Sequence, residues 1–189
     1  NNYIEINDFG DQTLFQILKN KKNNKYVIFK KIIKILNKIQ LIKDKKVKNF
    51  KNKFYKVQEY NNQILFDETK LFCDWYAPKI LSKSKSIQFK KKFRLEIKKL
   101  LSKLNYKNVT FVHRDFHVSN LMYHNKKIAV IDSQDALMGN RAYDLASLID
   151  DVRLKTPNKL KEKVFKFYVK TNKKIDFEKF KKDFEILSI

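Results

Sequence analysis

Residues 109–132 read VTFVHRDFHVSNLMYHNKKIAVID, and this stretch decides how the rest of the chain is interpreted. It opens on an apolar, β-branched run that predicts a short strand, and a second apolar run, Ile128–Ile131, predicts another. The polar loop between them carries Asp115 and, five positions later, Asn120, and the second strand is followed directly by Asp132. Strand, polar loop, hairpin and strand would bring two acids and one amide to a single edge.

The spacing matches the H-R-D-x-x-x-x-N catalytic loop, and the acid after the hairpin stands where kinases keep their magnesium aspartate. Phosphoryl transfer from ATP needs a carboxylate beside the attacking hydroxyl and hard oxygen ligands for Mg²⁺. We therefore predict that Asp115 is the base and that Asn120 and Asp132 bind Mg²⁺. The tripeptide HRD by itself also occurs by chance, so the prediction depends on all of these features lying in register.

Three segments resemble a known family. FVHRDFHVSNLM (111–122), IDSQDALMG (131–139) and YDLASLIDD (143–151) are similar to the aminoglycoside phosphotransferase family of small-molecule kinases. Within that family they look most like the cell-wall sugar kinases that phosphorylate the anomeric hydroxyl of N-acetylmuramate and N-acetylglucosamine. The family motif has an aromatic residue where Ser133 stands, but the metal ligand before it, Asp132, is kept.

The resemblance implies an α+β fold of the protein-kinase type, of which this chain would hold the C-terminal lobe. That lobe would be mostly α-helical, with a small β-hairpin sheet at the active site. Residues 1–10 would form the hinge strand and linker, and residues 11–189 the C-lobe. The lobe would contain a helical insertion (11–105), a catalytic core (106–154) and C-terminal helices (155–189). Adenine would be held by the backbone of Glu5, Ile6 and Asn7.

The chain lacks the sequence of an N-lobe. A kinase N-lobe needs a glycine-rich loop over the phosphates, a strand lysine and a helix glutamate. The two glycines, Gly10 and Gly139, cannot build such a loop. We therefore expect a C-lobe without its N-lobe, inactive when isolated, and a C-terminus that is also truncated, since the chain stops within the apolar face of its last helix.

Two further residues are expected to support the catalytic loop. His113 stands at the strand end, where a histidine commonly hydrogen-bonds the backbone. Asp144 opens a helix, where its charge suits the N-terminal dipole and its oxygens can hold the loop. The expected contacts of Arg114 are a substrate anion or a core carboxylate, and those of Asp135 are the metal, the acceptor or its own turn. The candidates for substrate contacts are Arg114, His117, Asp135, Glu68, Asp74 and Trp75.

The last three of these candidates come from the helical insertion, which in the family helps to build the acceptor pocket. An indole face stacks on sugar rings and carboxylates bind sugar hydroxyls. The alternative interpretation is that Trp75 belongs to the core and that Glu68 and Asp74 are surface acids. The histidines at 113, 117 and 124 lack the spacing of a zinc site.

Apolar residues recur at helical spacing over most of the remaining chain. A protein kinase would place a long activation segment after Asp132, whereas here the next helix follows within about ten residues. A small-molecule substrate is therefore expected. The expected helices are one beginning near Thr13, Lys25–Lys43, Gln63–Leu81 interrupted by Pro78, Ser86–Leu104, Ala142–Leu154, Lys159–Lys170 and one from Asp176 onward.

Composition restricts the class of protein. A chain of 189 residues with 43% hydrophobic residues can bury a core. The single cysteine, Cys73, excludes an intramolecular disulfide. No signal peptide or membrane-spanning pattern is visible, so we expect a cytoplasmic protein without a membrane partner. The sequence predicts nothing about oligomeric state.

The formal net charge is +23, and two explanations for it stay open. Lysine, asparagine and isoleucine are abundant while glycine and proline are scarce, as AT-rich codon bias would produce. Alternatively, the charge attracts anions such as ATP and acidic sugars and repels polycationic aminoglycosides. Other acceptors used within the family, or a non-catalytic basic module that binds nucleic acid or anionic surfaces, are the competing hypotheses; of these, nucleic-acid binding is disfavoured.

Overall fold

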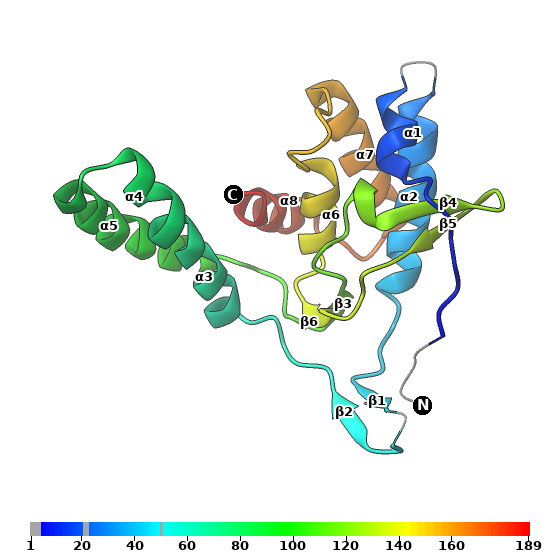
Figure 1. Cartoon of the computed structure of the whole chain (residues 1–189), viewed down its shortest axis with the longest axis horizontal. Helices are drawn as coiled ribbons and strands as arrows, with labels where there is room; N and C mark the ends of the chain where they lie inside the picture. The colour runs from blue at the N-terminus through cyan, green and yellow to red at the C-terminus, as the bar shows by residue number, and fades with distance from the viewer. Residues whose placement is uncertain (1–4, 21–22, 50) are drawn as a thin grey trace.

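The computed structural model describes residues 5–20, 23–49 and 51–189. Figure 1 shows a helical body from which an arm extends to one side. The body contains α1 (Leu14–Lys19), α2 (Lys25–Ile39), α6 (Tyr143–Ile149), α7 (Asn158–Thr171) and α8 (Phe177–Leu187). The arm contains α3 (Asn62–Leu71), a π-helical turn (Phe72–Tyr76), α4 (Ala77–Ile80) and α5 (Lys83–Leu101).

Three antiparallel two-stranded sheets accompany the helices. They pair β1 (Lys46–Lys48) with β2 (Phe54–Lys56), β3 (Thr110–Val112) with β6 (Leu137–Gly139), and β4 (Leu121–His124) with β5 (Lys127–Val130). The β4–β5 hairpin turns through Asn125 and Lys126, which both have positive φ (49° and 62°). Two consecutive residues of this kind suit a tight hairpin, because their twist matches that of the strands. The expected mixture of helices and a small hairpin sheet is therefore present.

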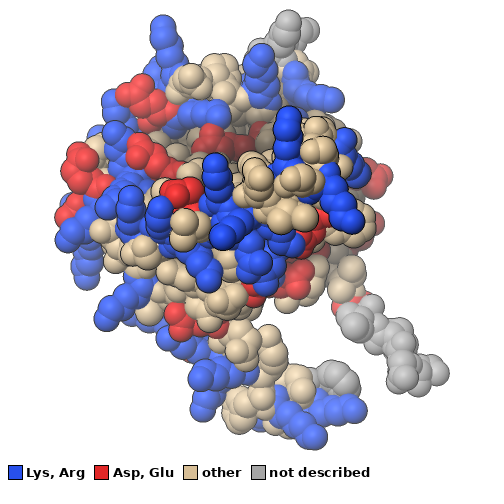
Figure 2. Space-filling view, turned by 90° about the vertical axis from the view of Figure 1, so that its left-hand side faces the viewer, with Lys and Arg blue, Asp and Glu red and all other residues tan. Residues whose placement is uncertain are grey.

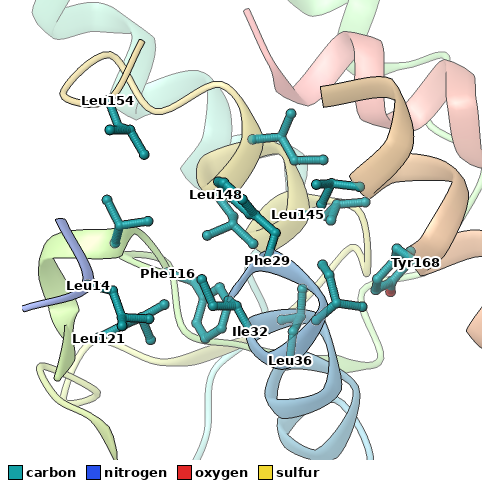
Figure 3. Packing of buried hydrophobic residues seen from close by; sticks show 14 of the residues in the cluster. Leu14, Phe29, Ile32, Leu36, Phe116, Leu121, Leu145, Leu148, Leu154 and Tyr168 are labelled. Carbon is teal, nitrogen blue, oxygen red and sulfur yellow. The ribbon is translucent and has the colours of Figure 1, made fainter. Parts of the chain in front are cut away.

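The core of the body holds residues 113–120, the expected catalytic loop, in place. Helix α2 buries Phe29, Ile32 and Leu36 completely, and they belong to one cluster with Phe116 of the loop and Leu145 of α6 (Figure 3). Burying a large apolar side chain contributes roughly 1.5–3 kcal/mol. The loop is thus anchored by hydrophobic packing on the side opposite to its polar residues.

A glycine permits the close packing around β6. A Cβ atom added to Gly139 would lie 2.7 Å from the side chain of Val112 on β3 and 3.3 Å from Cβ of Tyr60. The backbone N–H of Tyr60 donates to the carbonyl of Met138 (2.8 Å), and the N–H of Met138 donates to Gln58 (2.9 Å). The segment before α3 therefore joins the sheet that leads into the catalytic loop.

Several helix boundaries differ from the sequence-based expectation. The helix expected over Gln63–Leu81 is divided by the π-helical turn, and Pro78 lies in the first turn of α4. Because proline has no N–H, it cannot donate to a carbonyl one turn back, and the π-helical turn lies directly before α4. The helix expected over Lys25–Lys43 ends at Ile39. Strand β1 lies in the lysine-rich segment that follows, for which no element was predicted.

Two other expectations also need correction. The helix expected over Ala142–Leu154 is shorter, Tyr143–Ile149, and ends with Asp150 as its C-cap. Of the expected hinge strand, Tyr3 and Ile4 lie outside the described residues, and residues 5–10 form no strand. The chain there turns through Gly10, with φ of 71°.

Basic side chains are spread over the surface. On the face drawn in Figure 2, Lys and Arg alternate with Asp, Glu and neutral residues and do not gather into one stripe. Within the described ranges, no helix is both long and apolar enough to cross a membrane.

Candidate active site

Asp144 of α6 anchors the start of the catalytic loop. Its carboxylate accepts the backbone N–H of His113 (2.8 Å) and of Arg114 (3.1 Å) and is fully buried. Burial penalises the charged form and raises the pKa of Asp144 to about 7, although both N–H groups act in the opposite direction. Arg114 has φ of 75°, a conformation that non-glycine residues adopt only when the surroundings impose it.

Beyond Arg114 the loop exposes one side chain and then buries the next three. Asp115 is exposed, whereas Phe116 and Val118 are fully buried. The carbonyl of Asp115 accepts the N–H of His117 (3.0 Å), and a 3₁₀ turn, Val118–Asn120, follows. The apolar anchors therefore present the carboxylate of Asp115 to solvent.

Asn120 connects Asp115 to Asp132. Its side-chain Nδ2 donates to the backbone carbonyl of Asp115 (3.1 Å) and to Oδ2 of Asp132 (3.4 Å). The backbone carbonyl of Asn120 accepts the N–H of Ile131 (3.1 Å). Asp132 has φ of 68°, and its Oδ1 accepts from Nε2 of Gln134 (2.5 Å). The three residues that the motif singled out thus lie at one exposed edge.

His113 joins the two strand ends of the site. Its Nε2 lies 3.0 Å from the carbonyl of Ile131, which can only accept, so this nitrogen carries the proton. Burial lowers the pKa of His113, while this bond and the charges of Asp115 and Asp132 act in the opposite direction. A neutral His113 therefore ties the residue before Asp132 to the end of β3.

His117 is buried rather than directed into solvent. It is 8% exposed, and its Nδ1 has no hydrogen-bond partner among the described residues. Burial, the larger cause, and the positive charge of Arg153 both lower the pKa of His117. Although His117 follows Asp115 by only two positions, its ring is buried and does not lie on the exposed edge.

Asn120 and Asp132 fit a magnesium ion. The carboxylate of Asp132 is exposed, and the amide of Asn120 engages its partners through Nδ2, which leaves Oδ1 as a hard oxygen ligand. Among the described residues, no group of three or more His, Cys, Asp and Glu side chains could hold a metal ion. One carboxylate and one amide oxygen suit Mg²⁺, which keeps waters and phosphate oxygens as its other ligands.

The expected hinge residues share a pocket with the segment that contains Asp132. Glu5, Ile6 and Asn7 line one wall of this open pocket of ≈720 Å³, together with Phe9. The other wall is formed by residues 130–134, which include Asp132. The tertiary structure thus brings together two segments that are more than 100 residues apart in the chain.

The side chain of Arg114 is directed toward helix α3 of the arm. Its guanidinium donates to Oε1 of Glu68 on α3 (2.5 Å) and to the carbonyl of Asp135 (3.3 Å), and it lies 5.0 Å from the ring centre of Tyr60. The hydroxyl of Tyr60 donates to the other oxygen of Glu68 and lies 3.0 Å from the hydroxyl of Tyr143. The contacts expected for Arg114 were a substrate anion or a core carboxylate. The structure shows a carboxylate, that of the half-buried Glu68. The side chain of Asp135 is exposed.

The two other candidates from the arm do not contact the catalytic loop. Asp74 forms an ion pair with Lys90 of α5, and the two line a separate pocket with Cys73. Trp75 is 70% exposed and belongs to the π-helical turn that leads into α4. Of the three arm candidates, only Glu68 reaches the residues around Asp115.

An apolar pocket separates the arm from α8. Its volume is ≈470 Å³, and most of its lining comes from leucine, isoleucine and phenylalanine side chains of α3, α5 and α8. Glu68, Thr69 and Tyr143 are its polar lining residues. A ligand in this pocket would meet the same carboxylate that binds Arg114.

Comparison with known proteins agrees with this geometry. Residues 16–177 match the phosphotransferase enzyme family, APH. The match includes Asp115, Asn120 and Asp132. The chain belongs to this family.

Three curated relatives are named N-acetylmuramate/N-acetylglucosamine kinase. The protein of Neisseria meningitidis serogroup B is 36% identical over 93 residues, which cover 49% of this chain and 28% of the relative. That of Pseudomonas aeruginosa is 26% identical over 157 residues (83% and 43%), and that of Pseudomonas putida 29% identical over 98 residues (52% and 29%). The matched part of the chain covers less than half the length of each of these relatives.

Sequence reasoning missed three residues of this candidate site. Gln134 follows Asp132 closely, and its polar side chain next to a metal motif was an available signal. Tyr60 and Tyr143 reach the site by tertiary packing, with ring centres 4.9 Å apart in an edge-to-face arrangement. No local pattern distinguishes Tyr60 from the other tyrosines of the chain.

Proposed function

We propose that this chain supplies the catalytic lobe of an ATP-dependent sugar kinase. The observation that carries the proposal is the convergence of Asp115, Asn120 and Asp132 at one exposed edge, beside the pocket lined by residues 5–7. The names of the curated relatives support N-acetylmuramate or N-acetylglucosamine as the acceptor. Phosphorylation at the anomeric hydroxyl and a role in cell-wall recycling are carried over from the resemblance of the sequence motifs. Such a reaction would take place in the cytoplasm, where ATP is available.

In this reaction Asp115 orients the sugar hydroxyl and accepts its proton. The sugar oxygen forms a bond to the γ-phosphorus while the bond between that phosphorus and the ADP oxygen breaks. Asn120 and Asp132 would hold Mg²⁺, which would neutralise charge on the phosphates. His113 and Asp144 keep the two loops in place, so that the base and the metal ligands stay together.

The nucleotide end of the site uses the segment before α1. In the proposal, the backbone of Glu5, Ile6 and Asn7 receives adenine, and residues 130–134 face it across the pocket. Residues 1–10 would connect this lobe to an N-lobe that completes the phosphate-binding site. The activity is therefore tested both on the chain and on the protein extended by any flanking coding sequence.

The first test is release of ADP from ATP and Mg²⁺ in the presence of N-acetylmuramate. We expect Asp115→Asn to lower turnover by about 10²–10⁴-fold, the usual contribution of a general base. Thermal unfolding should stay unchanged, because Asp115 is exposed. Asp67→Asn is the matched control, since Asp67 is an exposed acid that pairs with Lys70 on α3. Phosphorus NMR of the product identifies the hydroxyl that is phosphorylated.

Other outcomes distinguish the competing hypotheses. Turnover with a different acceptor only, abolished by Asp115→Asn, would keep the kinase and discard the cell-wall sugar. No turnover with any acceptor, together with nucleic-acid binding that salt weakens and Asp115→Asn does not affect, would contradict the enzyme and support a basic binding module.

A further inference from the structure

The arm helix α3 directs one carboxylate at the catalytic loop. Oε1 of Glu68 accepts from the guanidinium of Arg114 at 2.5 Å, and Oε2 accepts from the hydroxyl of Tyr60. Both oxygens are therefore engaged by protein groups. A sugar hydroxyl that bound Glu68 directly would have to compete with these two bonds.

Arg114 is the residue immediately before Asp115, and it is held from two sides. Its backbone N–H donates to Asp144 (3.1 Å), and its side chain contacts Glu68, the carbonyl of Asp135 and the ring of Tyr60. Its φ of 75° is unfavourable for a residue with a Cβ atom. Such a conformation persists only where the surrounding contacts impose it. Among these contacts of Arg114, the one with Glu68 is an ion pair.

The charge of Arg114 requires a partner. A guanidinium seeks carboxylates and phosphates, and in this site both Asp115 and the phosphates of ATP would attract it. Glu68 neutralises it, and the pair is partly shielded from water, with side chains 26% (Arg114) and 37% (Glu68) exposed. Pairing with Glu68 thus leaves the carboxylate of Asp115 free for the acceptor hydroxyl.

We propose that Glu68 is a positioning residue that holds Arg114 and so sets the orientation of Asp115. Through this contact the helical arm is coupled to the catalytic loop, and through the carbonyl of Asp135 to the segment that follows Asp132. The inference rests on the proposed role of Asp115 as the base. Glu68 itself is not required to touch the substrate.

Kinetics separate positioning from substrate binding. For Glu68→Gln, which keeps the shape and removes the charge, kcat should fall between about tenfold and about a hundredfold, as for a misplaced catalytic group. The KM values for ATP and sugar should stay within about twofold. Glu68→Asp should recover part of kcat, and Asp67→Asn, the neighbouring acid on α3, should behave like the wild type.

A double variant tests whether Glu68 acts through Arg114. If it does, Glu68→Gln combined with Arg114→Gln should be no slower than the slower single variant. A raised KM for the sugar at unchanged kcat, with additive effects in the double variant, would overturn the proposal and make Glu68 a direct substrate contact.

A readout without turnover separates this inference from the proposed function. The amides of His113 and Arg114, which donate to Asp144, should exchange hydrogen faster in Glu68→Gln than in the wild type and in Asp67→Asn. Faster exchange in a protein without phosphotransferase activity would support the coupling while the kinase proposal fails. Unchanged exchange together with unchanged kcat would contradict the coupling.

Discussion

At the scale of single residues, Asp144 shows how the site uses burial. Its carboxylate supports the loop through two backbone N–H groups, yet no cationic side chain among the described residues pairs with it. Burial therefore dominates and raises its pKa from 3.8 to about 7. Between these two values the folded protein binds more protons at this site than the unfolded chain does, so this residue makes stability fall as pH rises through that window.

The expected consequence is a pH-dependent difference between the wild type and Asp144→Asn, which cannot titrate. The free energy of unfolding of the wild type, minus that of the variant, should fall from about pH 4 to about pH 7, by at most about 1.4 kcal/mol per pH unit. Above about pH 8 the difference should level off. Urea denaturation across this range measures it, with Asp115→Asn as the control for loss of an exposed charge. Parallel curves for wild type and Asp144→Asn would contradict the raised pKa.

At the scale of elements, α8 is tied to the site by Asp183. This fully buried carboxylate accepts four hydrogen bonds: from the N–H (2.7 Å) and side-chain amide (2.8 Å) of Asn105, the N–H of Tyr106 (2.9 Å) and the side chain of Asn140 (2.7 Å). Asn105 and Tyr106 lie shortly before β3, which leads to His113. Asn140 lies shortly before α6, which contains Asp144. The polar centre of α8 therefore helps to hold the catalytic core together.

Asp183→Asn should destabilise the protein by about 3 kcal/mol, because the new amide group would face donors in a buried site. Chemical denaturation measures the loss. Glu185→Gln, at an exposed and weakly paired position on the same helix, should change the free energy of unfolding by less than about 0.5 kcal/mol. Equal effects of the two substitutions would show that the buried network does not contribute specifically.

At the scale of the whole molecule, the net charge of +23 is spread over a surface that also carries acids (Figure 2). A field of this sign raises the local concentration of anionic ligands and is screened by salt. Its effect should therefore depend on the charge of the ligand rather than on its shape. The two proposed sugars offer such a comparison, because N-acetylmuramate is an acid and N-acetylglucosamine is neutral.

We expect the KM for ATP and for N-acetylmuramate to rise severalfold between about 50 mM and about 300 mM NaCl. The KM for N-acetylglucosamine should stay nearly constant under the same conditions. Initial-rate measurements with the two sugars provide the comparison within one protein. Equal salt dependence for both sugars would mean that the lysines do not act on the acceptor, in agreement with compositional bias as their origin.

The sequence by itself determined the local features of this protein. Asp115, Asn120 and Asp132 lie in one short stretch, where strand, loop and hairpin follow from neighbouring residues alone. The amphipathic pattern over residues 25–43 likewise predicted helix α2. These features were predictable because the interactions that produce them span few residues.

Tertiary structure decided the features that join distant segments. The pairing of β3 with β6, the contacts of Glu68 with Arg114 and Tyr60, and the four bonds to Asp183 each link residues well separated in the chain. No periodicity encodes them, since their geometry depends on how the whole chain packs. The same distinction explains why Glu68 was expected to contact a sugar, whereas the folded chain places its carboxylate on Arg114, the residue before the proposed base Asp115.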